Sequence, residues 1–369
     1  MHSEPLLILV VATALAFDFT NGFHDTANVV ATSMSTRALS PRVAVGIAAA
    51  LNFAGAFISL KVAATIATGI VSTGAITLPI VFAGLIGACF WNLATWWFGL
   101  PSSSSHALIG GVVGSVLVAK GSHAVQFAGL LGKVIIPAFI APVAAFAVAG
   151  LAIIFTYRLT ARLRPGPAGR GFRLGQIFSG GMLSLAHGTN DAQKTMGVIT
   201  LALVANGDIS AHRVAVPDWV IVAAASAIAL GTYAGGWRII RTLGTRIIKM
   251  DPAQGFTAQS AGAAVVLAAS HVGFPLSTTH VMAGGIIGAG AGKRLSAVRW
   301  GVAGNIAIAW LLTLPAAAAV GAATYAVTKA IGNGTLGPFV IAVIAIAAIL
   351  AAMLRRAREL QSEPATARR

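Results

Sequence analysis

Long apolar stretches are the feature that most constrains how this chain can fold. They recur along the whole sequence, for example at residues 43–68, 134–156, 216–237 and 339–354. A helix needs about 20 mostly apolar residues to cross the roughly 30 Å hydrocarbon core of a bilayer. Apolar residues make up 57% of the 369, and only 9 are Asp or Glu, which is too little charge to cover a soluble domain. We therefore expect an all-α integral membrane protein that crosses the cell (cytoplasmic) membrane several times.

The basic residues do not indicate a nucleic-acid partner. The 25 Lys and Arg residues are spread between the apolar stretches and do not form one basic domain. The single cysteine, Cys89, excludes an intramolecular disulfide framework or a thiolate metal cluster, and we expect no bound metal or cofactor. Residues 6–16 are typical of a signal-peptide core, but no Lys or Arg precedes them. We expect this segment to be kept as the first span, with the lipid bilayer as the surrounding partner.

The positive charges predict the orientation, because cytoplasmic loops are enriched in Lys and Arg. Threading the chain with its N-terminus outside leaves few basic residues outside, namely Lys120, Lys133, Arg213 and Lys329. It places most of the others inside: Arg37, Arg42, Arg158, Arg162, Arg164, Arg170, Arg173, Arg238, Arg241, Arg246, Lys249, Lys293, Arg294, Arg299 and the arginines from 355 onward. Residues 158–175 are thus predicted to be a basic cytoplasmic linker, and residues 356–369 a basic C-terminal tail.

Two segments must enter and leave the membrane on the same side for this threading to work. They are residues 78–119 and 256–292, and a polar break interrupts each one, at 101–106 and at 275–280. Non-helical backbone at membrane depth persists only where protein or a water-filled cavity satisfies its polar groups. We therefore predict two re-entrant hairpins whose tips meet at a site.

The sequence repeats itself internally. PSSSSHALIGGVVG at 101–114 matches PLSTTHVMAGGIIG at 275–288, and GFHDTAN at 22–28 matches GTNDAQK at 188–194. The motifs occur in the same order in the two halves, 1–157 and 176–355. An odd number of crossings in the first half would insert the second upside down. We predict two inverted-topology repeats, each with spanning helices, a broken first helix and a re-entrant hairpin. The GGxxG glycines would allow close helix packing.

The hydroxyl residues of the two hairpin tips favour an anion as ligand. Each cluster follows a proline and begins a glycine-rich helix, and a helix N-terminus offers free N–H groups and a positive dipole end. Two such ends facing one another would surround a small tetrahedral oxyanion. The alternative is that the hydroxyls only cap their own helices. The residues concerned are Ser103, Ser104, Ser105, Ser277, Thr278 and Thr279.

Acidic residues inside the predicted spans point to coupled transport. Asp25 and Asp191 are repeat partners, and Asp18 is the third such acid. A carboxylate about 5 Å from an anion repels it by about 3 kcal/mol per charge pair at an effective dielectric constant of about 20. Cations or protons must therefore enter with the anion. Backbone carbonyls of the broken helices near Asn21, Asn28 and Asn190 would supply further oxygen ligands for a cation. The alternative is that Asp191 neutralises Lys194 and that amides hold Asp25.

These motifs resemble the inorganic phosphate transporter family, and the resemblance covers almost the whole chain. Asp25 and Asn28 match the first GxNDxxN-type signature, and Gly188, Asn190 and Asp191 match the second. The resemblance implies that the hairpin tips contribute to a phosphate site, and that Na⁺ or H⁺ is co-transported. Some members carry sulfate, and bacterial ones carry a metal-phosphate complex. His24 and Lys194 depart from the signatures. Gln193 would accept a hydrogen bond from a P–OH group, together with the two acids.

Four further residues are weaker candidates for the site. His106 and His280 either orient the site or relay a proton, or they only pack. Asp18 either serves a remote cation site or faces a helix partner. Lys194 is the fourth candidate. His24 and His187 are weaker still. The expected function is phosphate symport by alternating access, with sulfate transport or an anion channel as alternatives. An enzyme is not expected, because HExxH and GxSxG motifs are absent. The sequence leaves a homodimer open.

Overall fold

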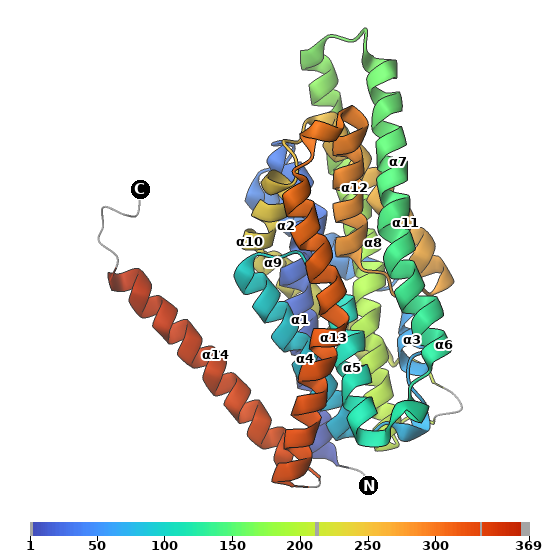
Figure 1. Cartoon of the computed structure of the whole chain (residues 1–369), viewed down its shortest axis with the longest axis vertical. Coiled ribbons are helices and arrows are strands. Elements are labelled where there is room, and N and C mark those ends of the chain that lie inside the picture. Colours follow the sequence, from blue (N-terminus) through green and yellow to red (C-terminus); the bar gives the residue numbers. More distant parts are fainter. Residues whose placement is uncertain (1–2, 211–213, 333, 363–369) are drawn as a thin grey trace.

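The computed structural model describes residues 3–210, 214–332 and 334–362, and these residues form helices without a β-strand. The predicted all-α class is therefore confirmed. The first half contains α1 (Glu4–Ser35), α2 (Pro41–Gly55), α3 (Lys61–Thr68), η1 (Thr73–Ala75), α4 (Leu78–Phe98), α5 (Ser104–Lys120), η2 (Ser122–Ala124), α6 (Phe127–Leu130), η3 (Leu131–Ile135) and α7 (Ile136–Thr160). The second half contains α8 (Pro165–Asn206), α9 (Asp218–Ala234), α10 (Trp237–Arg241), η4 (Thr242–Arg246), α11 (Pro252–Val272), α12 (Thr278–Lys293), η5 (Leu295–Ala297) and α13 (Trp300–Ile331). A last helix, α14 (Leu336–Ser362), extends away from the bundle (Figure 1).

Several helices are long and apolar enough to cross a membrane. In the described part of the chain these are α1, α4, the continuous run from α6 to α7, and α13. The bent pair formed by α9 and α10–η4, with an angle of 59° between its parts, is a further candidate. These spans confirm a multi-pass membrane protein. The longest helix, α8, does not belong to this set, and its middle carries the second signature motif.

The same order of elements occurs twice. A long helix carrying a signature motif (α1 or α8) precedes an interrupted pair (α2–α3 or α9–α10), a two-helix hairpin (α4–α5 or α11–α12), a short 3₁₀ turn and another long helix (α7 or α13). Figure 1 shows the α7–α8 turn at the end of the molecule opposite the N-terminus, so α1 and α8 run in opposite directions.

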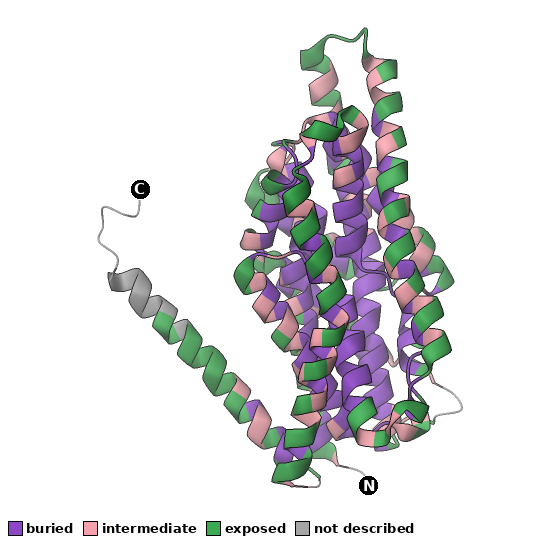
Figure 2. Ribbon diagram, in the orientation of Figure 1, coloured by how far each residue is buried: buried purple, intermediate pink, exposed green. Residues whose placement is uncertain are grey.

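Glycines let each hairpin pack tightly against a long helix of the other half. A Cβ at Gly114 of α5 would lie 2.0 Å from the carbonyl oxygen of Ala318 in α13. A Cβ at Gly288 of α12 would lie 2.2 Å from that of Phe146 in α7. The predicted packing role of these glycines is confirmed. Both tips lie in the buried interior, where Figure 2 shows a continuous purple core.

The prediction of a broken first helix in each half is wrong. Helices α1 and α8 are continuous through both signature motifs. Gly22 and Gly188 serve close packing instead: a Cβ at Gly22 would lie 2.3 Å from the Ile228 carbonyl oxygen, and one at Gly188 would lie 2.1 Å from the Asn52 carbonyl oxygen. The interruptions fall in the second helix of each half, between α2 and α3 and between α9 and α10. Backbone carbonyls of the signature motifs are therefore occupied by helical hydrogen bonds.

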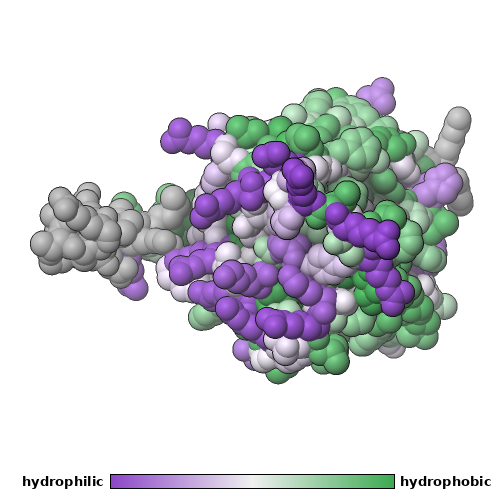
Figure 3. All heavy atoms as spheres, turned by 90° about the horizontal axis from the view of Figure 1, so that it is seen from above, coloured by the Kyte–Doolittle hydropathy of each residue, from purple (hydrophilic) through white to green (hydrophobic). Residues whose placement is uncertain are grey.

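The segment 158–175 contains the end of α7, a short turn at 161–164 and the first residues of α8. Within the predicted tail, residues 356–362 belong to α14, and residues 363–369 lie outside the described residues. Figure 3 looks onto the end with the α7–α8 turn, where hydrophilic side chains gather above apolar sides. Exposed basic residues of the described segments near this end include Arg162, Arg164, Arg170 and Arg173.

Three elements are joined at this polar end by Asp251, the N-cap of α11. Its carboxylate accepts hydrogen bonds from the Tyr157 hydroxyl of α7 and, over 2.9 Å, from the Lys293 ammonium of α12. The Gln254 side chain completes a capping box with it. Partial burial alone would raise the pKa of Asp251, but these hydrogen bonds and the nearby positive charge hold it below its ordinary value.

Candidate functional site

Both signature motifs and both hairpin tips meet at one place in the core. Helices α1 and α8 contribute their middle turns, and α5 and α12 contribute their N-termini. The side chains of Asp25, Asn28, Asp191 and Lys194 are buried there, as are the tip hydroxyl residues. The tips also touch directly, since the Ser105 hydroxyl donates to the Leu276 carbonyl over 3.1 Å. The structure thus brings together most of the residues predicted for the site, and encloses them.

Asp25 accepts hydrogen bonds from hydroxyl groups of both tips. The Ser104 hydroxyl of α5 lies 3.3 Å from Asp25 Oδ1, and the Thr279 hydroxyl of α12 lies 3.4 Å from the same oxygen. His24 Nδ1 lies 2.6 Å from this oxygen too. The other ring nitrogen of His24 lies 3.1 Å from Thr95 Oγ1 of α4. His24 therefore links the carboxylate to α4, the helix that leads into the first tip.

Asp191 is paired with Lys194, one helical turn later in α8. Lys194 Nζ lies 2.6 Å from Asp191 Oδ1, and it also donates to the Ser105 hydroxyl and, over 2.8 Å, to the Leu276 carbonyl. The Thr278 hydroxyl lies 3.4 Å from Asp191 Oδ2. Buried ammonium and carboxylate groups persist when their hydrogen bonds are satisfied in this way. The ion pair between Asp191 and Lys194, which the sequence left as an alternative role for Asp191, is therefore present within the same cluster that holds the tips.

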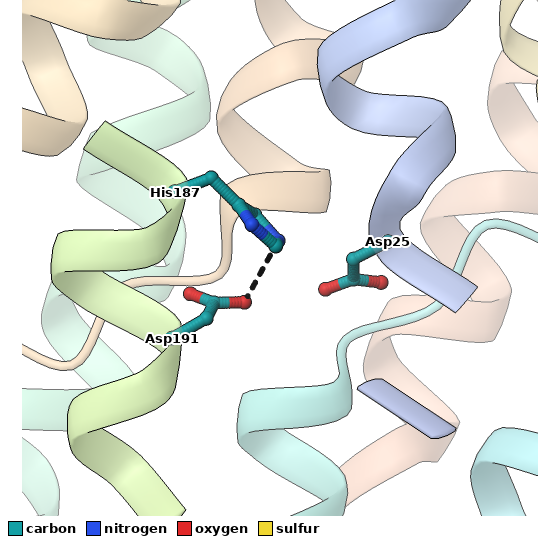
Figure 4. Close-up of side chains that lie close together, drawn as sticks. All are labelled: Asp25, His187 and Asp191. Carbon is teal, nitrogen blue, oxygen red and sulfur yellow. Dashed lines mark ion pairs between the residues drawn. The ribbon is translucent and has the colours of Figure 1, made fainter. Parts of the chain in front are cut away.

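Asp25, His187 and Asp191 form a compact group of side chains of the types that bind cations. One ligand atom from each lies within 4.8 Å of the others. Figure 4 shows the three side chains pointing toward one another across the space between α1 and α8. His187 Nε2 lies 3.3 Å from Asp191 Oδ2, and its Nδ1 lies 3.2 Å from the Asn52 side-chain oxygen. The residues present would fit a small cation, with imidazole and carboxylate donors.

The first hydroxyl of each tip acts as a helix cap. The Ser103 side chain accepts the His106 N–H over 3.1 Å, and the Ser277 side chain accepts the His280 N–H over 3.3 Å. The second and third hydroxyls, in contrast, face the acids and Lys194. Within each triplet, one hydroxyl therefore caps its own helix, and the other two are directed at the charged side chains.

Two predicted residues point elsewhere. The Gln193 side-chain oxygen accepts the N–H groups of Val62 and Ala63, over 2.8 and 3.1 Å, and so caps the start of α3. Asn190 donates to the Ser270 hydroxyl over 2.8 Å and to the Phe274 carbonyl over 3.2 Å. These bonds fix the segment between α11 and the second tip. Neither side chain forms a hydrogen bond with Asp25 or Asp191 in the structure, and these contacts hold the start of α3 and the segment before the second tip.

The tip histidines pack on the side of the tips that faces an apolar cavity. The rings of His106 and His280 lie 4.8 Å apart, and His280 stacks on Trp310 at 4.1 Å. Both line a cavity of about 560 Å³ between α7 and α13. His280 Nδ1 lies 3.4 Å from the Ala138 carbonyl. These contacts favour a packing role over direct contact with a ligand.

Asp18 and Asn21 lie nearer the start of α1, away from the tips. Both side chains are buried, and none of their polar atoms has a hydrogen-bond partner. Asn21 was predicted to stand with Asp25 and Asn28 as a cation ligand. In the structure the Asn28 amide donates to Thr278 and Thr279, over 3.2 and 3.0 Å, whereas the Asn21 side chain lies between Asp18 and Asp25 along the same face of α1 and forms no hydrogen bond.

Comparison with known proteins shows which family this chain belongs to. The model of the phosphate transporter family matches residues 21–170 and 164–321. The chain belongs to this family. A "probable low-affinity inorganic phosphate transporter" of Mycobacterium bovis is 54% identical over 328 residues, covering 89% of this chain and 79% of the relative. Proteins of the same name are 48% identical in Rhizobium meliloti and 43% identical in Bacillus subtilis, each covering 87% of this chain and 96% of the relative.

A solved structure supports the same family. The chain is similar to "the sodium-dependent phosphate transporter" with a TM-score of 0.79 and 27% identity, covering 89% of this chain and 100% of that one. The relatives named here all carry phosphate in their names, which gives no support to the sulfate alternative. They are named as transporters and not as enzymes.

The sequence interpretation missed three residues that contact the buried acids or their partners. His24 and His187 were weighted low, and Thr95 was not considered. His187 precedes Asp191 by four residues, which is one turn of a continuous helix, so a helical reading of the motif would have placed both on one face.

Proposed function

We propose that this protein is a secondary active transporter that moves inorganic phosphate across the cytoplasmic membrane together with Na⁺ or H⁺. The observation that carries the proposal is the convergence of the two tips on the acid–lysine cluster. The hydroxyls of Ser104 and Thr279 approach Asp25, that of Thr278 approaches Asp191, and that of Ser105 accepts from Lys194. In the proposal, phosphate takes the place of these internal partners.

The donors suit a tetrahedral oxyanion. Four tip hydroxyls come from two sides, one ammonium group is present, and the first N–H groups of α5 and α12 have no partner within their helices. Phosphate also carries P–OH groups near neutral pH, and the carboxylates of Asp25 and Asp191 accept from them. Sulfate lacks such donors, so it would face the carboxylates with bare oxygens.

The charges favour co-transport of a cation. Asp25 and Asp191 bring two negative charges and Lys194 brings one positive charge, so a phosphate dianion would enter a site that is already negative. At about 5 Å and an effective dielectric constant of about 20, each unpaired charge costs the anion about 3 kcal/mol. A cation between Asp25, His187 and Asp191 would remove this repulsion. The name of the structural relative favours Na⁺, and a proton remains the other candidate.

The architecture supports alternating access between two inverted repeats. The order of elements is the same in both halves, α1 and α8 run in opposite directions, and each hairpin packs on a long helix of the other half. The site residues are enclosed by protein. An enclosed site suits a carrier that opens to one side at a time, whereas a channel needs a continuous polar path.

Counterflow tests this function. Purified protein in proteoliposomes loaded with unlabelled phosphate is expected to take up labelled phosphate in a saturable way, with Na⁺ and pH gradients imposed separately. Replacing Ser104 and Thr278 together by Ala should raise the phosphate KM, because two donors are lost. Ser226→Ala is the matched control, since that hydroxyl only bonds the Val222 carbonyl within α9. Absence of counterflow, or equal inhibition by equimolar sulfate, would contradict the proposal.

A further inference from the structure

A second polar cluster lies between α1 and α8, outside the acid–lysine cluster. It consists of Asp18, Asn21 and Thr195, which we call the Asp18 cluster. All three side chains are buried, with 0 to 1% of their surface exposed. Both oxygens of Asp18, both polar atoms of Asn21 and the Thr195 hydroxyl lack a hydrogen-bond partner. Buried polar groups normally have partners, so a group of unpaired ones marks a place where something else binds.

The helical positions place this cluster beside the phosphate site without making it part of that site. Asp18, Asn21 and Asp25 follow one face of α1, and Asp18 lies seven residues, or about 10 Å along the helix, from Asp25. Thr195 follows Asp191 by four residues in α8. Asn21 follows Asp18 by one helical turn, and α8 packs against α1, which brings Thr195 close to the Asp18 carboxyl without a hydrogen bond.

Other titratable groups surround the cluster without neutralising it. From α8, Asp191 and Lys194 act on Asp18 through space; α1 itself carries His24 and Asp25; α4 brings the Cys89 thiol near Thr20. The α9 groups packed on this part of α1 include backbone of Ile228 and Gly231, which is uncharged.

Lys194 has no N–H group left for Asp18. Its ammonium has three hydrogens, and these are taken by Asp191, Ser105 and the Leu276 carbonyl. An ionised Asp18 would therefore be a buried charge without a paired partner, which is strongly unfavourable. The carboxyl must be neutralised by a proton or by a bound cation.

The oxygen atoms available do not suit a hard divalent cation. Hard cations such as Ca²⁺ and Mg²⁺ take about six or more oxygen ligands. The cluster offers four side-chain oxygens, and the backbone carbonyls of α1 and α8 belong to continuous helices. A proton on Asp18, by contrast, needs one acceptor, which the Asn21 amide oxygen or the Thr195 hydroxyl supplies.

We propose that the carboxyl of Asp18, held between Asn21 and Thr195, binds a proton that is carried with phosphate. This rests on the proposed function and identifies one coupling ion and its site. When Asp18–COOH gives its proton to water on the cytoplasmic side, it becomes a carboxylate. The new charge then repels the bound anion and competes with Asp191 for Lys194. Both effects favour release of phosphate on that side.

Asp18→Asn tests the site in proteoliposomes made with the full chain. One proton moved per phosphate across about one pH unit sustains about a tenfold accumulation of phosphate. The wild type should reach this ratio when the receiving side is alkaline, without Na⁺. Asp18→Asn should accumulate about tenfold less phosphate than the wild type in the same gradient, because only the proton that phosphate itself carries then moves with it. It should still exchange phosphate by counterflow at equal pH. Asp18→Glu should restore part of the accumulation, and Thr195→Val should shift the pH dependence of uptake.

Two controls keep the test decisive. Thr200→Val is matched to Thr195→Val, because Thr200 is also buried in α8 but bonds only the Met196 carbonyl. Asp218→Asn is matched to Asp18→Asn, because Asp218 is exposed at the start of α9. Accumulation by Asp18→Asn at the wild-type ratio, or a wild type driven by Na⁺ and insensitive to the pH gradient, would overturn the proton site while leaving phosphate transport intact. A wild type without counterflow would instead contradict the proposed function itself.

Discussion

Asn28 and Lys194 hold equivalent positions in the two signature motifs, and each donates to the third hydroxyl of the tip in the opposite half. Asn28 Nδ2 lies 3.0 Å from Thr279 Oγ1, and Lys194 Nζ donates to Ser105 Oγ. The geometry of the two halves therefore matches while the charge does not. Asp191 has an ammonium partner, whereas Asp25 has the His24 ring. The two acids are for this reason not interchangeable.

Lys194→Gln should destabilise the protein strongly. Removing one partner of a buried ion pair leaves the other charge uncompensated, at a cost of about 3–5 kcal/mol. The double variant Lys194→Gln, Asp191→Asn should recover most of this loss. Thermal unfolding in detergent, read as a double-mutant cycle, measures it. Additive losses in the double variant would mean that the pair does not contribute as a unit.

Asp25→Asn should abolish gradient-driven accumulation while equilibrium phosphate binding is kept or strengthened. Asparagine preserves size and hydrogen bonding but removes the negative charge that repels the anion and attracts the cation. Uptake and binding must be measured on the same purified sample, so that lost expression is not mistaken for lost transport. Concentrative uptake at the wild-type rate would show that Asp25 takes no part in coupling.

Gly288→Ala should loosen the contact between α12 and α7. Its Cβ would lie 2.2 Å from the Phe146 carbonyl oxygen, and overpacking of this kind costs about 1–3 kcal/mol. Gly46→Ala in α2 is the control, because no atom lies within 4 Å of its Cβ position, and there alanine should be neutral or should stabilise the helix by about 0.5–1 kcal/mol. The unfolding temperature should fall for Gly288→Ala and should stay the same or rise for Gly46→Ala; a fall of similar size in both would show that the interlocking contact is not the cause.

The sequence predicted which residues lie at the site better than where their side chains point. Repetition identified both acids and both hydroxyl triplets, because apolar packing alone does not require the same polar motifs to occur twice in the same order. The broken helix was wrong because a glycine in an apolar segment has two readings, unwinding and close packing. Gly22 and Gly188 face backbone of neighbouring helices, a contact made by residues far away in sequence.

The assumption of a broken helix also explains why the direction of the Gln193 side chain was predicted wrongly. In a continuous helix, residues three or four apart share a face, while residues two apart point to nearly opposite sides. Gln193 is two residues from Asp191 and caps α3, whereas His187 and Thr195 are each four residues from Asp191. Reading the motif as an unbroken helix would have exchanged Gln193 for these two.

Asp251→Asn should lower stability near neutral pH and flatten its dependence on acid. The pKa of Asp251 is held below its ordinary value in the folded protein, so its contribution is complete above about pH 4, the range of an unfolded carboxyl, and is lost as the pH falls through the folded pKa. Asparagine can still cap α11, so the loss should stay near 1 kcal/mol or less. Unfolding temperatures of both proteins from pH 7 to pH 3 should converge at the acid end. Parallel curves would show that the carboxylate charge does not stabilise this junction.

The turn between α7 and α8 should face the cytoplasm. Exposed arginines lie in and after it, and positive charge is retained on that side of a membrane. After Cys89→Ala removes the native thiol, Ala161→Cys places a single exposed thiol in the turn. Ser122→Cys places one in η2, beside α6 at the other end of the bundle (Figure 1). An impermeant maleimide added to intact cells should label the Ser122 variant and should label the Ala161 variant only after the cells are opened. The reverse pattern would invert the topology, and with it the direction in which Asp18 is expected to release its proton.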